Sequence, residues 1–480
     1  MALGEKMART AVAVVMAMGL IATACGGDDE PAAGSDTTAV ETTAAIETTA
    51  APEETSVETT IGGDTGGVTL DEIGRLVPAE CTGEDNVARE DEGVTVDRVN
   101  LSAVNIDLAP VADLGFSASD VDMSRMSSVF VDEVNDKGGV CGRQIDLQQV
   151  LFNTILGATA IGAACVQVTD DRPNLAAFSG NYQDPLCITD GGVPFLDGAN
   201  VTEAEMEETN GLLFSRYPSV EAQYRATAKY AIESGALEGT VGVWYGDSET
   251  ELGDVVENVV LPMLDEAGVD YTAVRTDFMG SYDPQGNAVL NAGATEFAAR
   301  GIDTLLAFVN NMNIADMQLE LDAQGLNPRY ISMPIAANTA IEVFAEQMGT
   351  REISDGMEYL GFTYSASEVD NDDPIARSCN EVWTRRTGEV LEPNTFDFMI
   401  LSAMCVMVDE VVAAISLAGG DLSRDSFVEA MASLPAHPTP GWLADMVWSH
   451  DYRFSPAVFA VEDYDGATNT VKTREDFFEV

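Results

Sequence analysis

The sequence has very little positive charge. Among its 480 residues, 23 are lysine or arginine and 81 are aspartate or glutamate, so the formal net charge is −58. A protein that neutralises nucleic-acid phosphates needs a basic face, and so does one that docks on anionic lipid through charge alone. The composition therefore argues against a nucleic-acid partner and predicts a solvated acidic surface.

The sequence also lacks the short motifs of common catalytic and metal sites. It contains no Gly-x-Ser-x-Gly elbow, no His-Glu-x-x-His helix and no Cys-x-x-Cys pair. Its only histidines, His437 and His450, are expected to be structural. The stretch 463–466 (Asp-Tyr-Asp-Gly) lacks the later glycine and glutamate of an EF-hand, so we expect a hairpin turn there. We expect no enzymatic activity, no cofactor and no metal.

Long hydrophobic runs are missing as well. The run 11–22 follows Lys6 and Arg9 and is too short to span a bilayer, which is typical of a secretory signal. No later segment is expected to be apolar over the ~18 residues that a membrane span needs. Small residues then precede Cys25, and this stretch resembles a lipoprotein signal-peptidase site, although Ala22 replaces the usual leucine. We expect residues 1–25 to be signal peptide and lipobox, with lipid on Cys25; ordinary cleavage is the alternative.

A low-complexity segment follows the signal. Residues 28–67 are rich in threonine, alanine and glutamate and contain no lysine or arginine. Such a segment cannot bury enough apolar surface to fold. We therefore expect residues 26–92 to be a disordered acidic tether between the lipid and a globular body.

The body begins with a strand–helix–strand unit at 99–152. Residues 99–106 and 144–152 have the β-branched, partly alternating pattern of strands, and 117–135 has apolar residues at helical spacing. Ser119 or Asp120 is expected to cap this helix. Parallel strands joined by a helix need both faces of their sheet covered, so the unit predicts an α/β fold.

The same alternation continues along the chain. Strands are expected at 174–178, 193–196, 212–218, 240–245, 271–274, 304–309, 329–333 and 356–361, with the last ones at 448–461. Helices are expected at 155–168, 185–189, 220–234, 252–267, 287–300, 314–324, 374–386, 395–417 and 426–434.

The nonapeptide 135–143, Asn-Asp-Lys-Gly-Gly-Val-Cys-Gly-Arg, resembles the type I periplasmic solute-binding proteins, closest to their leucine/isoleucine/valine-binding branch. The order of the elements resembles this branch over about 99–479. The resemblance implies two doubly wound parallel-sheet lobes joined by a three-strand hinge. Lobe I would comprise 93–216 and 361–445, and lobe II 217–360 and 446–480.

Six cysteines remain after the one assigned to the lipid. An even set in an exported chain predicts three disulfides out of fifteen possible pairings. Two cysteines on successive helices are paired with each other, two more lie on neighbouring units, and the last two lie at the starting ends of adjacent strands. The expected bonds are Cys379–Cys405, Cys165–Cys187 and Cys81–Cys141.

Parallel open sheets bind ligands in a crevice at the carboxyl ends of their strands. The loops expected there are 179–182, 197–200, 245–248 and 310–311. The resemblance implies that the first two hold a ligand carboxylate and that the others close over it. The candidate ligand-binding residues are Ser179, Asn181, Tyr182, Gly198, Ala199, Asn200, Tyr245, Asp247, Asn310 and Asn311.

The sequence departs from the branched-chain binders at one position. Those proteins place an acidic residue after the strand that corresponds to 329–333, where it meets the ligand ammonium. Here the residues 332–336 are Ser-Met-Pro-Ile-Ala. Either Asp247 or Asp197 takes over that role, or the ligand is an amide, a small carboxylate or an aromatic acid.

These observations predict a monomeric, lipid-anchored receptor on the outer face of the cytoplasmic membrane. It would capture a small polar organic ligand by hinge closure and deliver it to an ABC permease. One alternative is a secreted α/β hydrolase, which would need an activated nucleophile. The other is a ligand sensor of the same fold that docks on a membrane receptor.

Overall fold

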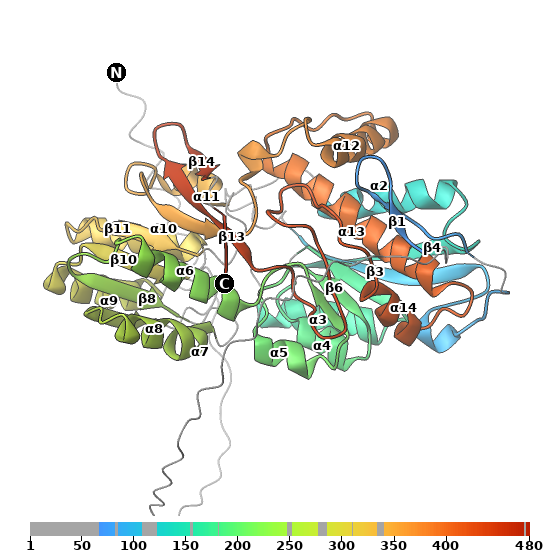
Figure 1. Ribbon diagram of the computed structural model, residues 1–480, viewed down its shortest axis with the longest axis horizontal. Coiled ribbons are helices and arrows are strands. Elements are labelled where there is room, and N and C mark those ends of the chain that lie inside the picture. The colour runs from blue at the N-terminus through green and yellow to red at the C-terminus, as the bar shows by residue number, and fades with distance from the viewer. Residues whose placement is uncertain are drawn as a thin grey trace, which may run out of the picture. The chain divides into compact units, whose positions relative to one another are not determined.

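Five parallel strands form the first sheet of this computed structural model, in the order β4-β3-β5-β6-β7; Figure 1 labels β4, β3 and β6 among them. This 2-1-3-4-5 order is that of a doubly wound α/β fold. The strands are β3 (Arg98–Ile106), β4 (Gln144–Phe152), β5 (Ala176–Ser179), β6 (Phe195–Asp197) and β7 (Leu213–Ser215). The helices between them are α2 (Met123–Asp136), α3 (Ala158–Thr169), α4 (Pro185–Asp190) and α5 (Glu203–Glu208).

The structure describes residues 67–81, 85–107, 122–153, 157–180, 182–246, 252–276, 286–309, 311–333, 340–474 and 477–480. Cys25, the signal segment and most of the predicted tether therefore lie outside the described residues.

A second sheet repeats the same strand order. Its parallel part runs β9-β8-β10-β11-β12, and β13 and β14 extend it as antiparallel strands. The strands are β8 (Val241–Tyr245), β9 (Tyr271–Arg275), β10 (Thr304–Phe308), β11 (Arg329–Ser332), β12 (Glu358–Gly361), β13 (Val458–Asp465), β14 (Thr470–Thr473) and β15 (Phe478–Glu479), which pairs with β13. The predicted fold class, with two doubly wound parallel-sheet lobes, is confirmed.

Helices cover both faces of the second sheet because its strands are apolar on both sides. Val243 and Leu306 face one core, whereas their strand neighbours Trp244 and Leu305 face another. The first of these cores includes α6 (Val220–Glu233), α7 (Leu252–Val255), the π-helical turn Val256–Val260 and α8 (Leu261–Glu266). The other includes α9 (Gly286–Arg300), α10 (Asn311–Ala323) and α11 (Ala340–Met348).

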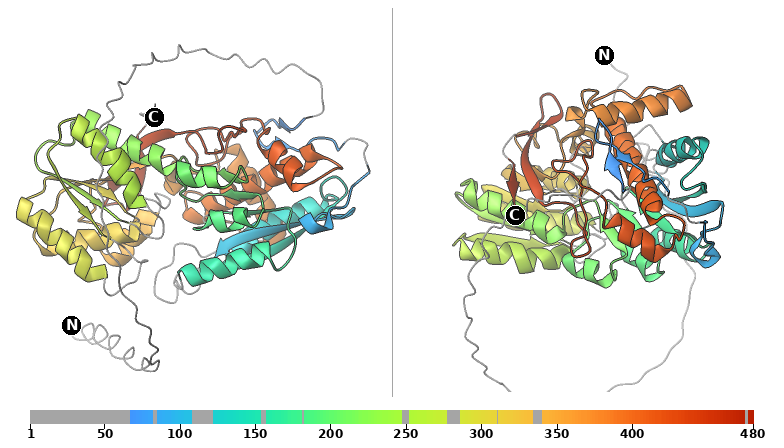
Figure 2. Two further views of the ribbon diagram at one scale, coloured as in Figure 1. Left: turned by 90° about the horizontal axis from the view of Figure 1, so that it is seen from below. Right: turned by 45° about the vertical axis from the view of Figure 1, so that its right-hand side comes forward.

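The last three helices return to the first sheet. Figures 1 and 2 show α12 (Pro374–Thr387), α13 (Phe396–Ala418) and α14 (Arg424–Met431), in orange, on the same lobe as the blue N-terminal strands. They share one core with α2 and with Leu101 of β3, while Val104 of β3 faces α3 and α4 on the other side. The first lobe is thus built from two distant parts of the chain.

Helix α13 corrects one expectation from the sequence. It is 23 residues long and its most apolar 18-residue window has a mean hydropathy of 2.1, so by length and composition alone it could cross a membrane. However, 89% of its most apolar window is buried inside the protein. The helix is therefore the central core helix of the first lobe, and its apolar surface is covered by α2, α12 and α14.

The chain passes between the lobes three times. The first crossing follows β7 at 216–219, the second follows β12 at 362–365, and the third leads into β13. The predicted boundary of the last crossing at 446 is too early, because Trp448 and Phe454 are still packed in the cores of the first lobe. Ala457 is the first residue of this segment to contact the second lobe's core.

The nonapeptide 135–143 is a structural junction. The Asn135 side chain accepts from the Ile145 N–H at 2.8 Å and donates to the Ile145 carbonyl at 2.9 Å. Gly139 has a φ of +75°, and a Cβ there would overlap the Arg143 carbonyl. The Arg143 guanidinium is fully buried and donates to four backbone carbonyls, those of Thr95, Gly419, Val87 and Gly420. The motif therefore joins the segment that contains Val87 and Thr95 to the turn at 419–420 in the first lobe.

Residues 69–81, which we name the N-terminal strap, lie on the first lobe. They form the short strands β1 (Thr69–Leu70) and β2 (Leu76–Val77). Arg75 makes a two-point ion pair with Asp409 of α13, and the Ala79 N–H donates to Ser416 of the same helix. The predicted end of the disordered tether at 92 is therefore wrong, because the described residues from 67 onward are packed on the lobe.

All three predicted disulfides are present. The bonds are Cys81–Cys141, Cys165–Cys187 and Cys379–Cys405, with Cα–Cα distances of 5.4, 6.1 and 6.0 Å. The first fixes the strap to the loop before β4, and the last joins α12 to α13. Each bond therefore links elements that are adjacent in space within the first lobe.

A few element boundaries differ from the prediction. Helix α2 begins at Met123 with Asp122 as its cap, while Ser119 and Asp120 lie outside the described residues. The short helices α5 and α11 were not predicted. Of the expected strand region 448–461, only the end belongs to a strand, β13, because the earlier residues pack as irregular chain against the first lobe.

Candidate functional site

The strand order of each sheet reverses at one point. In the first lobe this point lies between β3 and β5, and in the second between β8 and β10. Ligands of open α/β sheets bind beyond the carboxyl ends of the strands at such points. The predicted loops follow β5, β6, β8 and β10, so their described residues lie at the carboxyl edges of the two sheets, at or next to the switch points.

In the first lobe, the loops after β5 and β6 are hydrogen-bonded to each other. The Tyr182 N–H donates to Asp197 Oδ1 at 3.2 Å, and the Gly198 N–H donates to the carbonyl of Ser179 at 3.2 Å. Ser179 and Asp197 are the last residues of the paired strands β5 and β6 and are fully buried. The two loops therefore form one unit at the strand ends.

The same two loops approach each other closely at a pair of glycines. A Cβ on Gly198 would overlap the carbonyl oxygen of Gly180 and would lie 3.4 Å from Cε1 of Tyr217. A Cβ on Gly180 would meet no atom within 4 Å. Gly198 is thus required by packing, and Tyr217 places its ring beside this junction.

Asp197 is a fully buried carboxyl at the centre of this unit. Burial raises its pKa well above the usual range, and hydrogen bonds from Tyr182, Gly198 and Ser179 lower it by less. Because burial disfavours the charged form, the carboxyl can remain protonated at a pH where an exposed aspartate is ionised. Its described contacts tie the two loops together, which makes Asp197 a positioning residue.

Two of the predicted ligand contacts are core residues. The Tyr182 ring packs edge-on against Phe152 and Phe195, and its hydroxyl donates to the Ile161 carbonyl at 2.6 Å. Ala199 is also buried in this core. Both side chains are buried in this core, so they are packing residues and not exposed ligand contacts.

The remaining first-lobe candidates differ in position. Asn200 is half-buried, and its Oδ1 accepts from Gln223 of α6 at 3.1 Å. Gln223 also donates to the Pro218 carbonyl, so Asn200 is connected to the first crossing. Asn181 lies outside the described residues.

The second-lobe candidates are only partly described. The Tyr245 hydroxyl bonds to Glu257 at 3.2 Å, on the side of the sheet covered by α6 and α8, and burial raises its pKa to about 12. Tyr245 is therefore a packing residue. Asn311 begins helix α10 instead of lying in a loop. Asp247 and Asn310 lie outside the described residues.

The position after β11 carries no carboxylate among the described residues. Ser332 is buried and donates to the Ala307 carbonyl at 2.7 Å, and Met333 is buried in the core. Residues 334–339 lie outside the described residues and include no acidic residue in the sequence.

Sequence reasoning missed an aromatic pair at the crossings. Tyr217 of the first crossing and Phe362 of the second have ring centroids 4.8 Å apart, and both are half-buried. They adjoin the predicted site through the contact of Tyr217 with Gly198. The only sequence signal was their position, where the chain leaves one lobe for the other: Tyr217 lies near the end of the predicted strand 212–218, and Phe362 follows the predicted strand 356–361.

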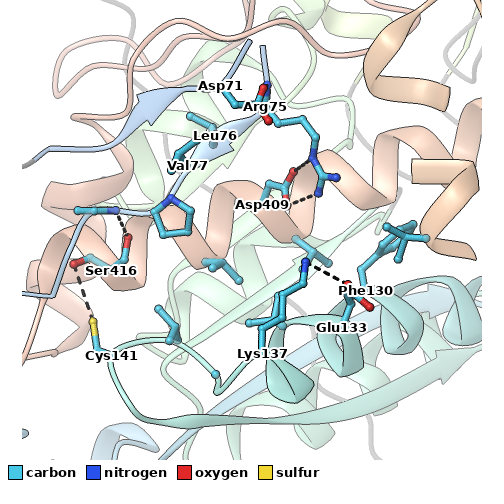
Figure 3. A pocket seen from close by; sticks show the side chains of 18 of the residues that line it. Asp71, Arg75, Leu76, Val77, Phe130, Glu133, Lys137, Cys141, Asp409 and Ser416 are labelled. Carbon is cyan, nitrogen blue, oxygen red and sulfur yellow. Dashed lines mark hydrogen bonds and ion pairs between the residues drawn. The ribbon is translucent and has the colours of Figure 1, made fainter. Parts of the chain in front are cut away.

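A cavity of about 480 Å³ lies elsewhere in the first lobe, between the strap and helices α2, α12 and α13 (Figure 3). Its charged groups are already paired. Arg75 binds Asp409 and Ser378, and Lys137 pairs with Glu133 at 3.0 Å. The cavity is formed in the helical layer and contains none of the predicted ligand residues.

No group of three or more histidine, cysteine, aspartate or glutamate side chains in the described part of the chain is arranged to hold a metal ion. His437 is buried and bonded to Glu410, whereas His450 is exposed and near Glu429.

Comparison with known proteins gives a match at the level of the fold. No protein-family model matches the chain, and no curated protein matches it by sequence. A leucine binding protein from Thermotoga maritima is similar with a TM-score of 0.59 and 16% identity, over 79% of this chain and 99% of that one.

Two further solved structures are similar to the same extent. A branched-chain amino acid ABC transporter protein from Thermus thermophilus with bound valine gives a TM-score of 0.59 and 13% identity, over 80% and 97% of the two chains. A fatty acid ABC transporter substrate-binding protein from Thermomonospora curvata gives 0.58 and 13%, over 82% and 95%.

The resemblance expected from the nonapeptide is thus confirmed, and the chain has the type I periplasmic binding fold of the leucine/isoleucine/valine-binding substrate-binding proteins.

Proposed function

We propose that this protein is an extracytoplasmic solute-binding protein that captures a small polar organic ligand and delivers it to an ABC permease. The observation that carries the proposal is the repeated 2-1-3-4-5 sheet with three crossings, because it puts two strand-switch points on one chain that can close on a ligand. Two of the compared structures are named as ABC transporter proteins, and the third is named a leucine binding protein.

The mechanism of capture is hinge closure. A ligand that contacts both strand edges favours the closed state by its differential affinity for the two states. The first-lobe edge offers Asn200 for an anionic or amide group, and Tyr217 and Phe362 offer aromatic surface at the crossings. The protein is not proposed to alter the ligand chemically.

The ligand class follows from the site's charges. The strand edge after β11 has no acidic residue for an ammonium group, and the buried Asp197 is engaged by Tyr182. A small carboxylate or amide therefore fits the first-lobe edge better than a free amine does. An α-amino acid would need Asp247 to hold its ammonium.

Export and anchoring complete the proposal. Three disulfides are typical of an oxidising compartment. We propose that Cys25 carries a lipid and that the acidic segment before the strap tethers a monomeric body to the outer face of the membrane. Expression of C25S should release the protein into the medium, whereas the wild type should stay with the membrane fraction.

The binding proposal is tested by calorimetric titration of the full-length protein with amino acids, their amides and small organic acids. Saturable one-to-one binding of a carboxylate or amide is expected. Titration with amines that lack a carboxylate or amide should give no heat, and preferential binding of such amines would contradict the proposed ligand class.

A further inference from the structure

Three ionisable side chains meet inside the first lobe, and none of them belongs to the predicted ligand site. Arg216 opens the first crossing, Glu410 lies on α13, and His437 lies in the loop after α14. All three are at most 1% exposed. His437 Nε2 lies 2.9 Å from Glu410 Oε1, and Arg216 Nη2 lies 3.7 Å from the same oxygen.

The contacts of His437 require a shared proton. Its Nδ1 lies 2.9 Å from the Pro435 carbonyl, which can only accept, so Nδ1 carries a hydrogen. Its Nε2 faces a Glu410 oxygen, and this bond needs one more proton, on the imidazole or on the carboxyl. If that proton is lost, two lone pairs face each other in a site without solvent.

Arg216 is held on several sides. It donates to the Ala403 carbonyl at 3.0 Å and to Thr439 Oγ1 at 3.4 Å. Its guanidinium stacks over the Trp442 ring at 4.9 Å, and Trp442 Nε1 donates back to the Arg216 carbonyl at 3.1 Å. The loop that carries His437 and Trp442 is thus fastened to the first crossing.

The charged groups that face Glu410 come from three elements. Arg216 approaches from the first crossing and His437 from the loop. Asp409 is its neighbour on α13 and is paired with Arg75 of the strap. Among the described residues, Glu410 Oε2 and Arg216 Nε have no hydrogen-bond partner. The network therefore depends on the bonds of Glu410 Oε1 and of the two Nη atoms of Arg216.

The loop 435–448 also binds the other crossings. The Tyr364 N–H donates to the Gly441 carbonyl at 2.7 Å, and the Leu443 N–H donates to the Phe362 carbonyl at 3.2 Å. Trp448 Nε1 donates to the Ser215 carbonyl at 2.9 Å, just before the first crossing.

The third crossing is attached through the first. The Ser455 N–H donates to the Tyr217 carbonyl at 3.3 Å, and the Ser215 N–H donates to the Arg453 carbonyl at 2.8 Å. One loop therefore contacts the first and second crossings directly, and the first crossing holds the third.

We propose that Arg216, Glu410 and His437 form a proton-dependent anchor that fixes the loop 435–448, and through it the three crossings, on the first lobe. These are positioning residues, since their side chains fix the hinge; only the main-chain N–H of Arg216, which donates to the Asp197 carbonyl at 2.8 Å, reaches a predicted ligand loop. Their effect on ligand capture rests on the proposed function, because hinge closure needs crossings that bend about a fixed point. Their effect on the position of the crossings does not rest on the proposed function.

The first test needs neither a ligand nor a variant. Amide hydrogen exchange of the full-length protein is measured over the whole pH range in which it stays folded, and each rate is divided by its intrinsic rate. Protection at Tyr364, Leu443 and Met446 should fall by about tenfold or more, the change expected when a buried hydrogen-bonded pair loses its proton. Protection in β8 should stay constant. Equal protection at all these amides across the range would overturn the proposal.

The second test uses a matched pair of variants. In H437Q the glutamine amide can donate to Glu410 at every pH, so the pH-dependent loss of protection should disappear. H450Q changes the exposed histidine that faces Glu429 at 3.4 Å and should keep the wild-type profile. An H437Q protein that retains the wild-type pH profile would overturn the proposal.

A third variant covers the case in which H437Q does not fold. W442F keeps a six-membered aromatic ring and removes the five-membered ring with the N–H that binds the Arg216 carbonyl. It should lower protection at Tyr364 and Leu443 at neutral pH, and unchanged protection would again contradict the anchor. Because these readouts need no ligand, a failure of ligand binding leaves the anchor intact, and a failed anchor leaves the ligand proposal open to its own test.

Discussion

The main-chain N–H of Tyr182 donates to Asp197 Oδ1 at 3.2 Å and so joins the loop after β5 to the end of β6. Both side chains are fully buried. The junction fixes the position of the first-lobe loops before any ligand arrives, which reduces the ordering that binding requires.

Replacing Asp197 should change the pH dependence of stability. Burial raises the pKa of Asp197 in the folded state above its unfolded value. The folded state then holds more protons between the two pKa values, so the contribution of Asp197 to the free energy of unfolding is greatest at acidic pH and falls as the pH rises. D197N keeps an oxygen that accepts from Tyr182 and cannot ionise. The part of the pH dependence of stability that comes from Asp197 should therefore vanish in this variant.

The measurement is denaturant unfolding of D197N, D197A and wild type at several pH values. D197A leaves the Tyr182 N–H without its acceptor, so its free energy of unfolding should fall by about 1–3 kcal/mol. D190N, at an exposed aspartate on α4, is the control and should retain the wild-type profile. If D197N and wild type show the same pH dependence, the buried acid is not ionising as described.

The two glycines of the loop junction should respond differently to the same substitution. G198A places a methyl group against the Gly180 carbonyl and should separate the two loops, lowering ligand affinity by about tenfold or more together with a loss of stability of about 1–3 kcal/mol. G180A meets no atom and should be tolerated. Thermal unfolding and titration of both variants check this, and equal behaviour would contradict the close approach.

The strap should depend on Arg75. Burial raises the pKa of Asp409 and the Arg75 cation lowers it in part, so R75A leaves a mostly buried carboxyl without its partner. We expect a loss of about 1–3 kcal/mol in unfolding free energy and faster exchange at the Ala79 amide. R98A removes an exposed pair with Asp146 and should change little. A strap whose exchange is unaffected by R75A would contradict this account.

Removing the disulfides should destabilise the chain according to the loops they close. The bond Cys81–Cys141 spans 60 residues, against 22 for Cys165–Cys187 and 26 for Cys379–Cys405. Chain entropy then predicts that the free energy of unfolding falls by about 4 kcal/mol when the first bond is removed and by about 3.5 kcal/mol when either of the others is removed. Unfolding of the paired serine variants measures this, and non-reducing peptide maps check the pairings. Any other connectivity in those maps would contradict the fold.

Much of the architecture could be predicted because its signals are local. The strand β4 was predicted with its observed bounds, since its apolar pattern is bounded by a glycine turn and a loop. The disulfides followed from the placement of cysteines on neighbouring elements. Long α13 was predicted as a helix but not as a core helix apolar enough to span a membrane, because its burial depends on helices from distant parts of the chain.

The site was harder to predict because a loop's position does not give its side-chain direction. Ser179 and Gly198 lie at the strand ends where the sequence placed them, yet Tyr182 and Tyr245 turn into the cores through bonds to Ile161 and Glu257. Contacts such as Tyr217 with Phe362, or His437 with Glu410, join segments with large sequence separation. No local pattern marks them.

The most direct test of the central claim is a calorimetric titration of the full-length protein against amino acids, amides and small organic acids, run in parallel with G198A. The account predicts that at least one compound binds wild type with one-to-one stoichiometry and that G198A binds it about tenfold or more weakly, because both loops at the first-lobe strand ends must be in register. Absence of binding across the whole panel, or equal binding to both proteins, would contradict it.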